Sequence, residues 1–235
     1  MKPNSEVRLC DCMEYMATLP DKFFDLVVAD PPYGLQGGKT NQFSGGGLHT
    51  KSKVKFGSRF KMGGDYNGKK WDEAVPDERF FRELRRVSTH QIIWGANYFP
   101  NMLPNRGAII WDKMQSVPNF SAFEYAFCSV DKPAAIYRER NHGIFRDNVS
   151  IHPTQKPIAL YAWLLEKYAK PGDKIFDPML GSGSSRIAAY KLGFDFWGCE
   201  MDAEYFEKAE KRFRESIAMP LFDEPNANQI TIFEQ

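Results

Sequence analysis

Short apolar runs of strand length alternate with longer amphipathic stretches over much of this chain. The apolar runs predict strands at 6–12, 25–29, 91–95, 108–111, 125–130, 174–176 and 196–199. The amphipathic stretches predict helices at 13–19, 76–87, 158–169, after Ser184 through Leu192, and at 204–217. Strands that alternate with helices are typical of an α/β protein with a doubly wound, mostly parallel sheet.

The strand predicted at 25–29 ends in the tetrapeptide Asp30-Pro31-Pro32-Tyr33. Proline has no N–H group for ladder pairing, so two consecutive prolines end the strand there. A carboxylate and an aromatic ring are left at the carboxyl end of a buried strand, the edge at which ligands bind in open α/β sheets. Asp30 and Tyr33 are therefore candidate site residues. The alternative for Asp30 is a helix cap or a turn carboxylate.

A second candidate follows the strand predicted at 174–176. Asp177 precedes a turn with Gly181 and Gly183, a helix follows, and the next strand ends at Glu200. The glycines allow a tight turn close to a ligand, and the acid about 20 residues on can accept hydrogen bonds from ribose hydroxyls. No third glycine stands where a dinucleotide pyrophosphate would meet the helix, which favours a nucleoside cofactor without that group. The alternative is a tight turn that binds nothing.

The segment 34–72 breaks the alternation, because it is rich in glycine and basic residues and lacks hydrophobic periodicity. Aromatic residues lie among the basic ones, a mixture that contacts phosphates and stacks on bases. We expect a loop insertion that contacts the phosphates and bases of a nucleic acid, against the alternative of a solvated insertion without a partner. A second, short polar segment, 131–151, is expected to take part in recognition. The residues expected to contact the nucleic acid are Lys39, Lys51, Lys53, Lys55, Arg59, Lys61, Arg138 and Arg140.

With 235 residues and 43% hydrophobic content, the chain is suited to one α/β domain. The formal net charge is only +1, so affinity for an anion must come from local clusters of charge. The four cysteines are scattered, and the C-x-C spacing of Cys10 and Cys12 does not fit a zinc or redox motif, so no metal site is expected. No apolar run approaches a signal sequence or the roughly 20 residues of a membrane span. We therefore expect a soluble, cytoplasmic protein.

Three motifs occur in a fixed order: Asp30-Pro31-Pro32-Tyr33, then HPTQKP at 152–157, then FDPMLGSGS at 176–184. Together with Glu200 they resemble the S-adenosylmethionine-dependent DNA amino-methyltransferases, in the group whose catalytic Asp-Pro-Pro-Tyr precedes the cofactor glycine loop. The resemblance implies a seven-stranded, mostly parallel Rossmann-like sheet with helices on both faces, in one domain over 1–218 with a flexible tail over 219–235. The residues that it implies bind S-adenosyl-L-methionine are Asp11, Asp30, Thr154, Gln155, Lys156, Asp177, Pro178, Gly181, Ser182, Gly183, Ser184, Glu200 and Asp202. For Asp11 the alternative is a simple turn or cap.

The resemblance also implies a reaction, which is direct methyl transfer to an exocyclic amine in double-stranded DNA. If Asp30 and the Pro31 carbonyl accept the two N–H bonds, the nitrogen lone pair turns toward the sulfonium methyl, and the carboxylate stabilises the developing positive charge. Tyr33, with Pro32 completing the catalytic tetrapeptide, would stack on a base flipped out of the duplex. With Asp30 at the first position of the tetrapeptide, the chain resembles the adenine-N6 enzymes, which act in DNA methylation and restriction-modification.

Three other functions stay open from the sequence. Cytosine-N4 enzymes share the motifs but more often have Ser at the position of Asp30. A nicotinamide oxidoreductase uses a similar nucleotide fold, although the tetrapeptide and the missing third glycine argue against it. A DNA-binding relative that has lost catalysis is the non-enzymatic alternative.

The last residues, Gln229-Ile230-Thr231-Ile232-Phe233, are similar to the short motif that binds the bacterial sliding clamp. A glutamine, two alternating aliphatic residues and a phenylalanine on a flexible tail can dock in an apolar groove as an extended peptide. The alternative is an edge strand or a tail packed on the domain. The family resemblance further implies a homodimer.

Overall fold

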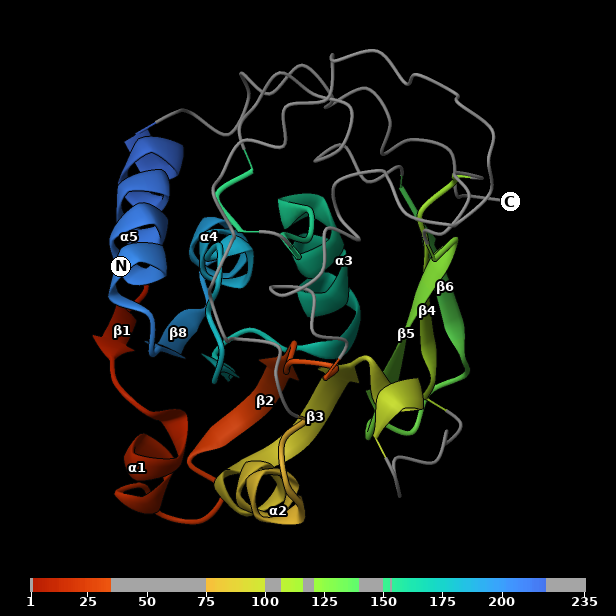
Figure 1. Cartoon of the computed structure of the whole chain (residues 1–235), viewed down its shortest axis with the longest axis horizontal. Helices are drawn as coiled ribbons and strands as arrows, with labels where there is room; N and C mark the ends of the chain where they lie inside the picture. Colours follow the sequence, from red (N-terminus) through yellow and green to blue (C-terminus); the bar gives the residue numbers. More distant parts are fainter. Residues whose placement is uncertain are drawn as a thin grey trace, which may run out of the picture.

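The computed structural model describes residues 2–34, 75–99, 107–115, 121–139, 150–152 and 154–218. They form an eight-stranded sheet in the order β1-β8-β7-β2-β3-β5-β4-β6, with helices on both faces (Figure 1). The strands are β1 (Ser5–Leu9), β2 (Phe24–Ala29), β3 (Ser88–Trp94), β4 (Ile109–Asp112), β5 (Phe123–Cys128), β6 (Ala135–Arg138), β7 (Lys174–Asp177) and β8 (Asp195–Glu200). The helices are α1 (Cys12–Ala17), α2 (Glu78–Val87), η2 (Ala96–Tyr98, a 3-10 helix), α3 (Ile158–Tyr168), α4 (Ser184–Lys191) and α5 (Ala203–Ala218). None of these helices has the length and apolar character needed to cross a bilayer.

Strand β2 shows why both faces of the sheet carry helices. Leu26 and Val28 pack with residues of α3 and α4, whereas Val27 and Ala29 pack with residues of α1 and α2 on the other face. All four side chains are buried. A strand covered on both faces reads as a continuous apolar run, which is the pattern found at 26–29. The predicted doubly wound α/β fold is confirmed.

The site edge of the sheet is set by the pairing of β2 with β7. These strands are parallel, with Leu26 opposite Ile175 and Val27 opposite Phe176. From β7 the chain continues to β8 on one side, and from β2 it continues to β3 on the other. Ligands bind at such a switch point, outside the carboxyl ends of the strands. Asp30 and the loop after Asp177 therefore leave the sheet at the same edge.

The sheet has one strand more than the seven expected. Strand β6 lies inside the polar segment 131–151 and pairs parallel with β4 at the edge of the sheet. Its Ile136 and Arg138 are exposed, while Ala135 and Tyr137 are half-buried. Such an edge strand has too few apolar residues to stand out from its polar neighbours. Strand β5 is antiparallel to β3 and β4, so the sheet is mostly parallel, as predicted.

Candidate active site

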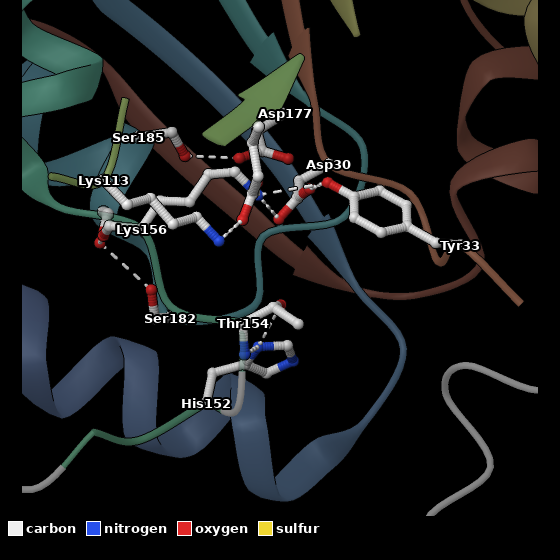
Figure 2. Close-up of polar contacts among 11 residues, drawn as sticks. Asp30, Tyr33, Lys113, His152, Thr154, Lys156, Asp177, Ser182 and Ser185 are labelled. Carbon is white, nitrogen blue, oxygen red and sulfur yellow. Dashed lines mark hydrogen bonds and ion pairs between the residues drawn. The ribbon is translucent and has the colours of Figure 1, made fainter. Parts of the chain in front are cut away.

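Asp30 follows β2, where Pro31 and Pro32 end the strand. Its two carboxylate oxygens have different partners (Figure 2). Oδ1 accepts a hydrogen bond from the Tyr33 hydroxyl at 2.7 Å, and Oδ2 lies 2.5 Å from Nζ of Lys156. The Asp30 side chain is 15% exposed, so it is shielded but still within reach of a group that arrives from solvent.

Gly95, directly after β3, supports the ring of Tyr33. Gly95 has a φ of +69°, and a Cβ at this position would lie 2.0 Å from Cε1 of Tyr33. Helix η2 then brings Tyr98 parallel to Tyr33, with 4.9 Å between ring centroids and 14° between ring planes. We call Tyr33 and Tyr98 the tyrosine pair. The two rings stack on each other, and Tyr98 is 41% exposed, so the pair leaves an accessible aromatic ring near Asp30.

Lys156 connects Asp30 to a second carboxylate, that of Glu124. Glu124 was not predicted from the sequence as a site residue. Nζ of Lys156 lies 3.0 Å from Oε2 of Glu124, whose Oε1 lies 2.6 Å from Nζ of Lys113. We call Asp30, Lys156, Glu124 and Lys113 the charge cluster. An acid inside the apolar run 123–128 was the available signal, because a buried charge requires a partner. The identity of that partner is not a local property of the sequence.

Opposite charges offset the burial of each member of the cluster. Burial raises the pKa of Asp30, Lys156 opposes this, and Glu124 adds to it. Burial works against ionisation of Glu124 as well, but Lys156 and Lys113 lower its pKa to about 2. Burial disfavours the charge of Lys156, yet the two acids raise its pKa. On balance the pKa of Asp30 is therefore raised, whereas that of Glu124 is lowered.

Asp177 ends β7 and begins the loop that leads to α4. Its Oδ1 accepts a hydrogen bond from the Met179 N–H at 3.0 Å. Its Oδ2 accepts one from the Ser185 hydroxyl at 2.5 Å, which Figure 2 shows. Burial raises the pKa of Asp177 to about 7, although both hydrogen bonds oppose the shift. Gly181 and Gly183 have φ angles of +52° and +72°, in the left-handed region that favours glycine. The loop is thus a tight glycine turn next to a buried carboxyl group.

Glu200, at the end of β8, braces the glycine turn. Its Oε2 accepts a hydrogen bond from the Gly181 N–H at 2.8 Å, and its Oε1 accepts from the N–H groups of Met201 and Asp202, each at 2.9 Å. Burial raises the pKa of Glu200. Asp202 in turn caps the start of α5 with its own carboxylate. Glu200 therefore lies beside the turn, and its contact with ribose hydroxyls stays a prediction.

Asp11 is the N-cap of α1, where its carboxylate accepts a hydrogen bond from the Met13 N–H at 2.7 Å. This is the alternative role considered from the sequence. The N–H of the preceding residue, Cys10, donates to the Glu200 carbonyl at 2.9 Å. Asp11 consequently lies at the same sheet edge as Glu200, and its contact with a cofactor stays a prediction.

The segment before α3 joins the glycine turn to Asp30. The Gln155 N–H donates to the His152 carbonyl at 3.1 Å, and the Thr154 hydroxyl lies 3.1 Å from Nδ1 of His152. The Ser184 hydroxyl donates to the Lys156 carbonyl at 2.8 Å. Lys156 is thus held by Ser184 through its backbone carbonyl and by the Asp30 carboxylate through its side chain.

Arg212, on α5, contacts the glycine turn and was not predicted from the sequence as a site residue. Its guanidinium donates to the Ser182 carbonyl at 2.8 Å and to the Ser184 hydroxyl at 2.9 Å. Pro178 is buried at the start of the same loop. On the sequence, Arg212 is one of many charges on an amphipathic helix, so nothing local distinguishes it.

The structure does not bring all the predicted site residues together. Arg138 lies on β6, with β4, β5 and β3 between it and β2, and its Nε is 3.4 Å from a carboxylate oxygen of Asp112. The remaining predicted DNA contacts and the clamp motif fall outside the residues that the structure describes; they are Lys39, Lys51, Lys53, Lys55, Arg59, Lys61, Arg140 and 229–233.

Comparisons with known proteins point to one class of enzyme. Residues 131–211 match the family model of the DNA methylases. The type II methyltransferase M.HinfI of Haemophilus influenzae is 27% identical in an alignment that covers 94% of this chain and 70% of that protein. The type II methyltransferase M2.MboI of Moraxella bovis is 25% identical in an alignment that covers 87% of this chain and 86% of that protein. These matches support a DNA methyltransferase.

Solved structures agree in fold. The M1.HpyAVI–SAM complex superimposes with a TM-score of 0.56 at 19% identity, over 88% of this chain and 98% of that one. TTHA0409 from Thermus thermophilus, complexed with S-adenosyl-L-methionine, gives a TM-score of 0.53 at 20% identity, over 91% and 94% of the two chains. At these identities the likeness concerns the fold alone, and it confirms the Rossmann-like sheet.

Proposed function

We propose that this protein transfers the methyl group of S-adenosyl-L-methionine to the exocyclic N6 amine of adenine in double-stranded DNA. One observation carries the proposal: Asp30 and the glycine turn leave adjacent parallel strands at the same edge of the sheet. A carboxylate that can accept an amine therefore lies beside a turn suited to a nucleoside cofactor. The match of residues 131–211 to the DNA methylases supports the same class.

The glycine turn fits a cationic nucleoside without a pyrophosphate. Gly181 and Gly183 allow the backbone to approach a ligand closely. Asp177 is a buried carboxyl group with a raised pKa, and a bound cation offsets the cost of its ionisation. When bound, S-adenosylmethionine supplies the electrophilic methyl group. The residues proposed to hold it are Asp11, Asp30, Thr154, Gln155, Lys156, Asp177, Pro178, Gly181, Ser182, Gly183, Ser184, Glu200 and Asp202.

In the proposed reaction, Asp30 and the Pro31 carbonyl accept the two N–H groups of the amine. The nitrogen lone pair is thereby turned out of conjugation with the ring and toward the methyl group, and the Asp30 carboxylate stabilises the positive charge that forms on nitrogen. The Tyr33 hydroxyl occupies Oδ1 of Asp30 at 2.7 Å, so the incoming amine competes with this hydrogen bond. The new N–C bond forms as the S–C bond of the sulfonium breaks, with the electron pair staying on sulfur in S-adenosylhomocysteine. The methylated nitrogen then loses one proton, and no covalent enzyme intermediate is required.

A base inside a duplex cannot present its amine to the methyl group, so the target base must leave the stack. The tyrosine pair provides an aromatic surface for it beside Asp30. We further propose that the basic residues of 34–72, with Arg138 and Arg140, contact DNA phosphates. Because the net charge of the chain is only +1, its attraction to DNA must come from such local clusters.

The proposal is tested with the purified full-length chain, duplex DNA and isotopically labelled S-adenosylmethionine. After digestion of the DNA to nucleosides, N6-methyladenine is the expected product. The family model covers enzymes of both kinds of amine, so a cytosine-N4 enzyme is the second candidate, and it would yield N4-methylcytosine. DNA without any methylated nucleoside would contradict both. Calorimetric titration that detects NAD binding but no S-adenosylmethionine binding would favour the oxidoreductase alternative.

The raised pKa of Asp177 predicts that cofactor binding depends on pH. Because a cationic ligand favours the ionised carboxyl, binding releases a proton below a pH of about 7, and the Kd should fall as the pH rises from about 6 to about 8. A decrease of up to roughly tenfold is expected, measured by calorimetry. The amine of the ligand loses its proton toward about pH 8, which weakens binding to either protein, so Asp177→Asn should lose the decrease in Kd. An identical dependence in the two proteins would contradict the prediction.

The same shift acts on the stability of the ligand-free protein. The pKa of Asp177 is about 7 in the folded state and roughly 4 in the unfolded state. The stability that its protonated form contributes is therefore complete below about pH 4 and is lost as the pH rises to about 7. The free energy of unfolding of the wild type, measured by denaturant titration, should therefore fall across this pH window relative to that of Asp177→Asn.

The tail extends the proposal to a partner. Deleting residues 229–235 is expected to abolish binding to a bacterial sliding clamp, measured by surface plasmon resonance, while methyl transfer stays within about twofold, because an extended peptide motif docks independently of the sheet. Clamp binding that survives the deletion, or that is absent from the full chain, would end this part of the proposal. The homodimer rests on the family resemblance and is proposed on that basis.

A further inference from the structure

Lys156 is shared between two carboxylates that come from different parts of the fold. Asp30 follows β2, and Glu124 lies on β5, with β3 between the two strands. Nζ of Lys156 is 2.5 Å from Asp30 Oδ2 and 3.0 Å from Glu124 Oε2. The Lys156 side chain is 2% exposed, so these two anions take the place of water around its charge.

An ammonium that is divided between two anions neutralises each of them less than an exclusive pair would. Lys113 lies 2.6 Å from the other oxygen of Glu124 and is 12% exposed, so it balances the second negative charge. Asp30 is consequently anchored through Oδ2, while Oδ1 is directed to the Tyr33 hydroxyl. Oδ1 is the oxygen that the incoming amine can use.

We propose that Glu124 is a positioning residue, which holds Lys156 so that one oxygen of Asp30 is anchored and the other stays basic enough to accept the amine. This inference deepens the proposed function and rests on it. If Glu124 is neutralised, Lys156 can pair with Asp30 alone. The carboxylate then stabilises the positive charge on the amine less well in the transition state.

The groups around Asp30 make the inference measurable. Lys156 lowers the pKa of Asp30 and Glu124 raises it, in addition to the increase that burial causes. The two neighbours act in opposite directions, so their variants should shift the titration of Asp30 in opposite directions. Tyr33, Glu124 and Lys156 act on Asp30 through the contacts described above. The charge of Asp30 also interacts with Tyr161 and Asp177, and Lys113 acts through Glu124.

The test is the pH dependence of kcat for methyl transfer to duplex DNA. Glu124→Gln is expected to lower kcat about 10- to 100-fold. KM for S-adenosylmethionine should change less than kcat, because Asp30 and Lys156, which are also proposed to hold the cofactor, keep their side chains and the glycine turn is unaltered. The acid limb of kcat should move to lower pH, on the order of half to one unit, in Glu124→Gln and to higher pH in Lys156→Met. A purely structural role for Glu124 would not produce opposite shifts.

Glu215→Gln is the matched control, since it removes a carboxylate from an exposed pair with Lys211 on α5, and it should keep wild-type kinetics. Thermal unfolding verifies the fold of each variant, and Glu124→Gln decides alone if Lys156→Met does not fold. An unchanged kcat, an acid limb that stays in place or moves to higher pH, or an unfolded Glu124→Gln protein would overturn the inference. A wild-type chain that methylates no DNA would overturn the proposed function, and the inference with it.

Discussion

Replacing Asp30 with alanine or asparagine is expected to lower kcat for DNA methyl transfer by about a hundred- to a thousandfold. The carboxylate both accepts the amine and offsets the positive charge that forms on nitrogen. Asparagine keeps the shape of the side chain and one acceptor oxygen but lacks the charge, so it separates the two contributions. Single-turnover rates with labelled S-adenosylmethionine and duplex DNA measure the loss directly.

A matched control stands at the opposite end of β2. Oδ2 of Asp25 accepts a hydrogen bond from the Lys174 N–H at 2.8 Å, and Asp25→Asn keeps an acceptor there. This variant should retain kcat within about twofold, since it lies at the other edge of the sheet from Asp30. Methyl transfer that survives in both Asp30 variants would mean that another group accepts the amine. A wild-type chain that binds duplex DNA but never methylates it would favour the inactive relative.

Replacing Gly95 with alanine is expected to lower kcat about 10- to 100-fold by displacing Tyr33. The new Cβ would lie 2.0 Å from Cε1 and 2.6 Å from Cζ of the Tyr33 ring, so the ring must move. Its hydroxyl would then leave Oδ1 of Asp30, and the aromatic surface that it forms with Tyr98 would be lost. Steric overlap and a left-handed alanine should together lower the free energy of unfolding by roughly 2–4 kcal/mol.

Gly193→Ala separates backbone strain from steric overlap. Gly193 has a φ of +81°, but no heavy atom lies within 4 Å of the position of its Cβ. Alanine at this position should cost about 1–2 kcal/mol of stability and leave kcat within about twofold. Gly95→Ala and Gly193→Ala should therefore differ more in kcat, measured kinetically, than in stability, measured by thermal unfolding. Equal losses of kcat would mean that Tyr33 is not the cause.

Much of the fold was predictable because its signals are local. The apolar run 25–29, closed by Pro31 and Pro32, predicted β2 and its end at Asp30, and the structure confirms both. The turn with Gly181 and Gly183 between a strand and a helix is confirmed as well, with positive φ at both glycines. Strand β6 was not predicted, since an edge strand with a solvated face resembles a polar loop in composition.

The sequence by itself determined which residues end strands at the site, because periodicity and proline or glycine chemistry act over a few neighbouring positions. Only the tertiary structure decided which charges meet there. Lys156 lies 123 positions after Tyr33 in the sequence, yet its Nζ is 2.5 Å from the Asp30 carboxylate. Glu124 contacts Lys156 from β5. Local patterns show that a buried acid or ammonium needs a partner, but the long-range pairing of strands selects which one it finds.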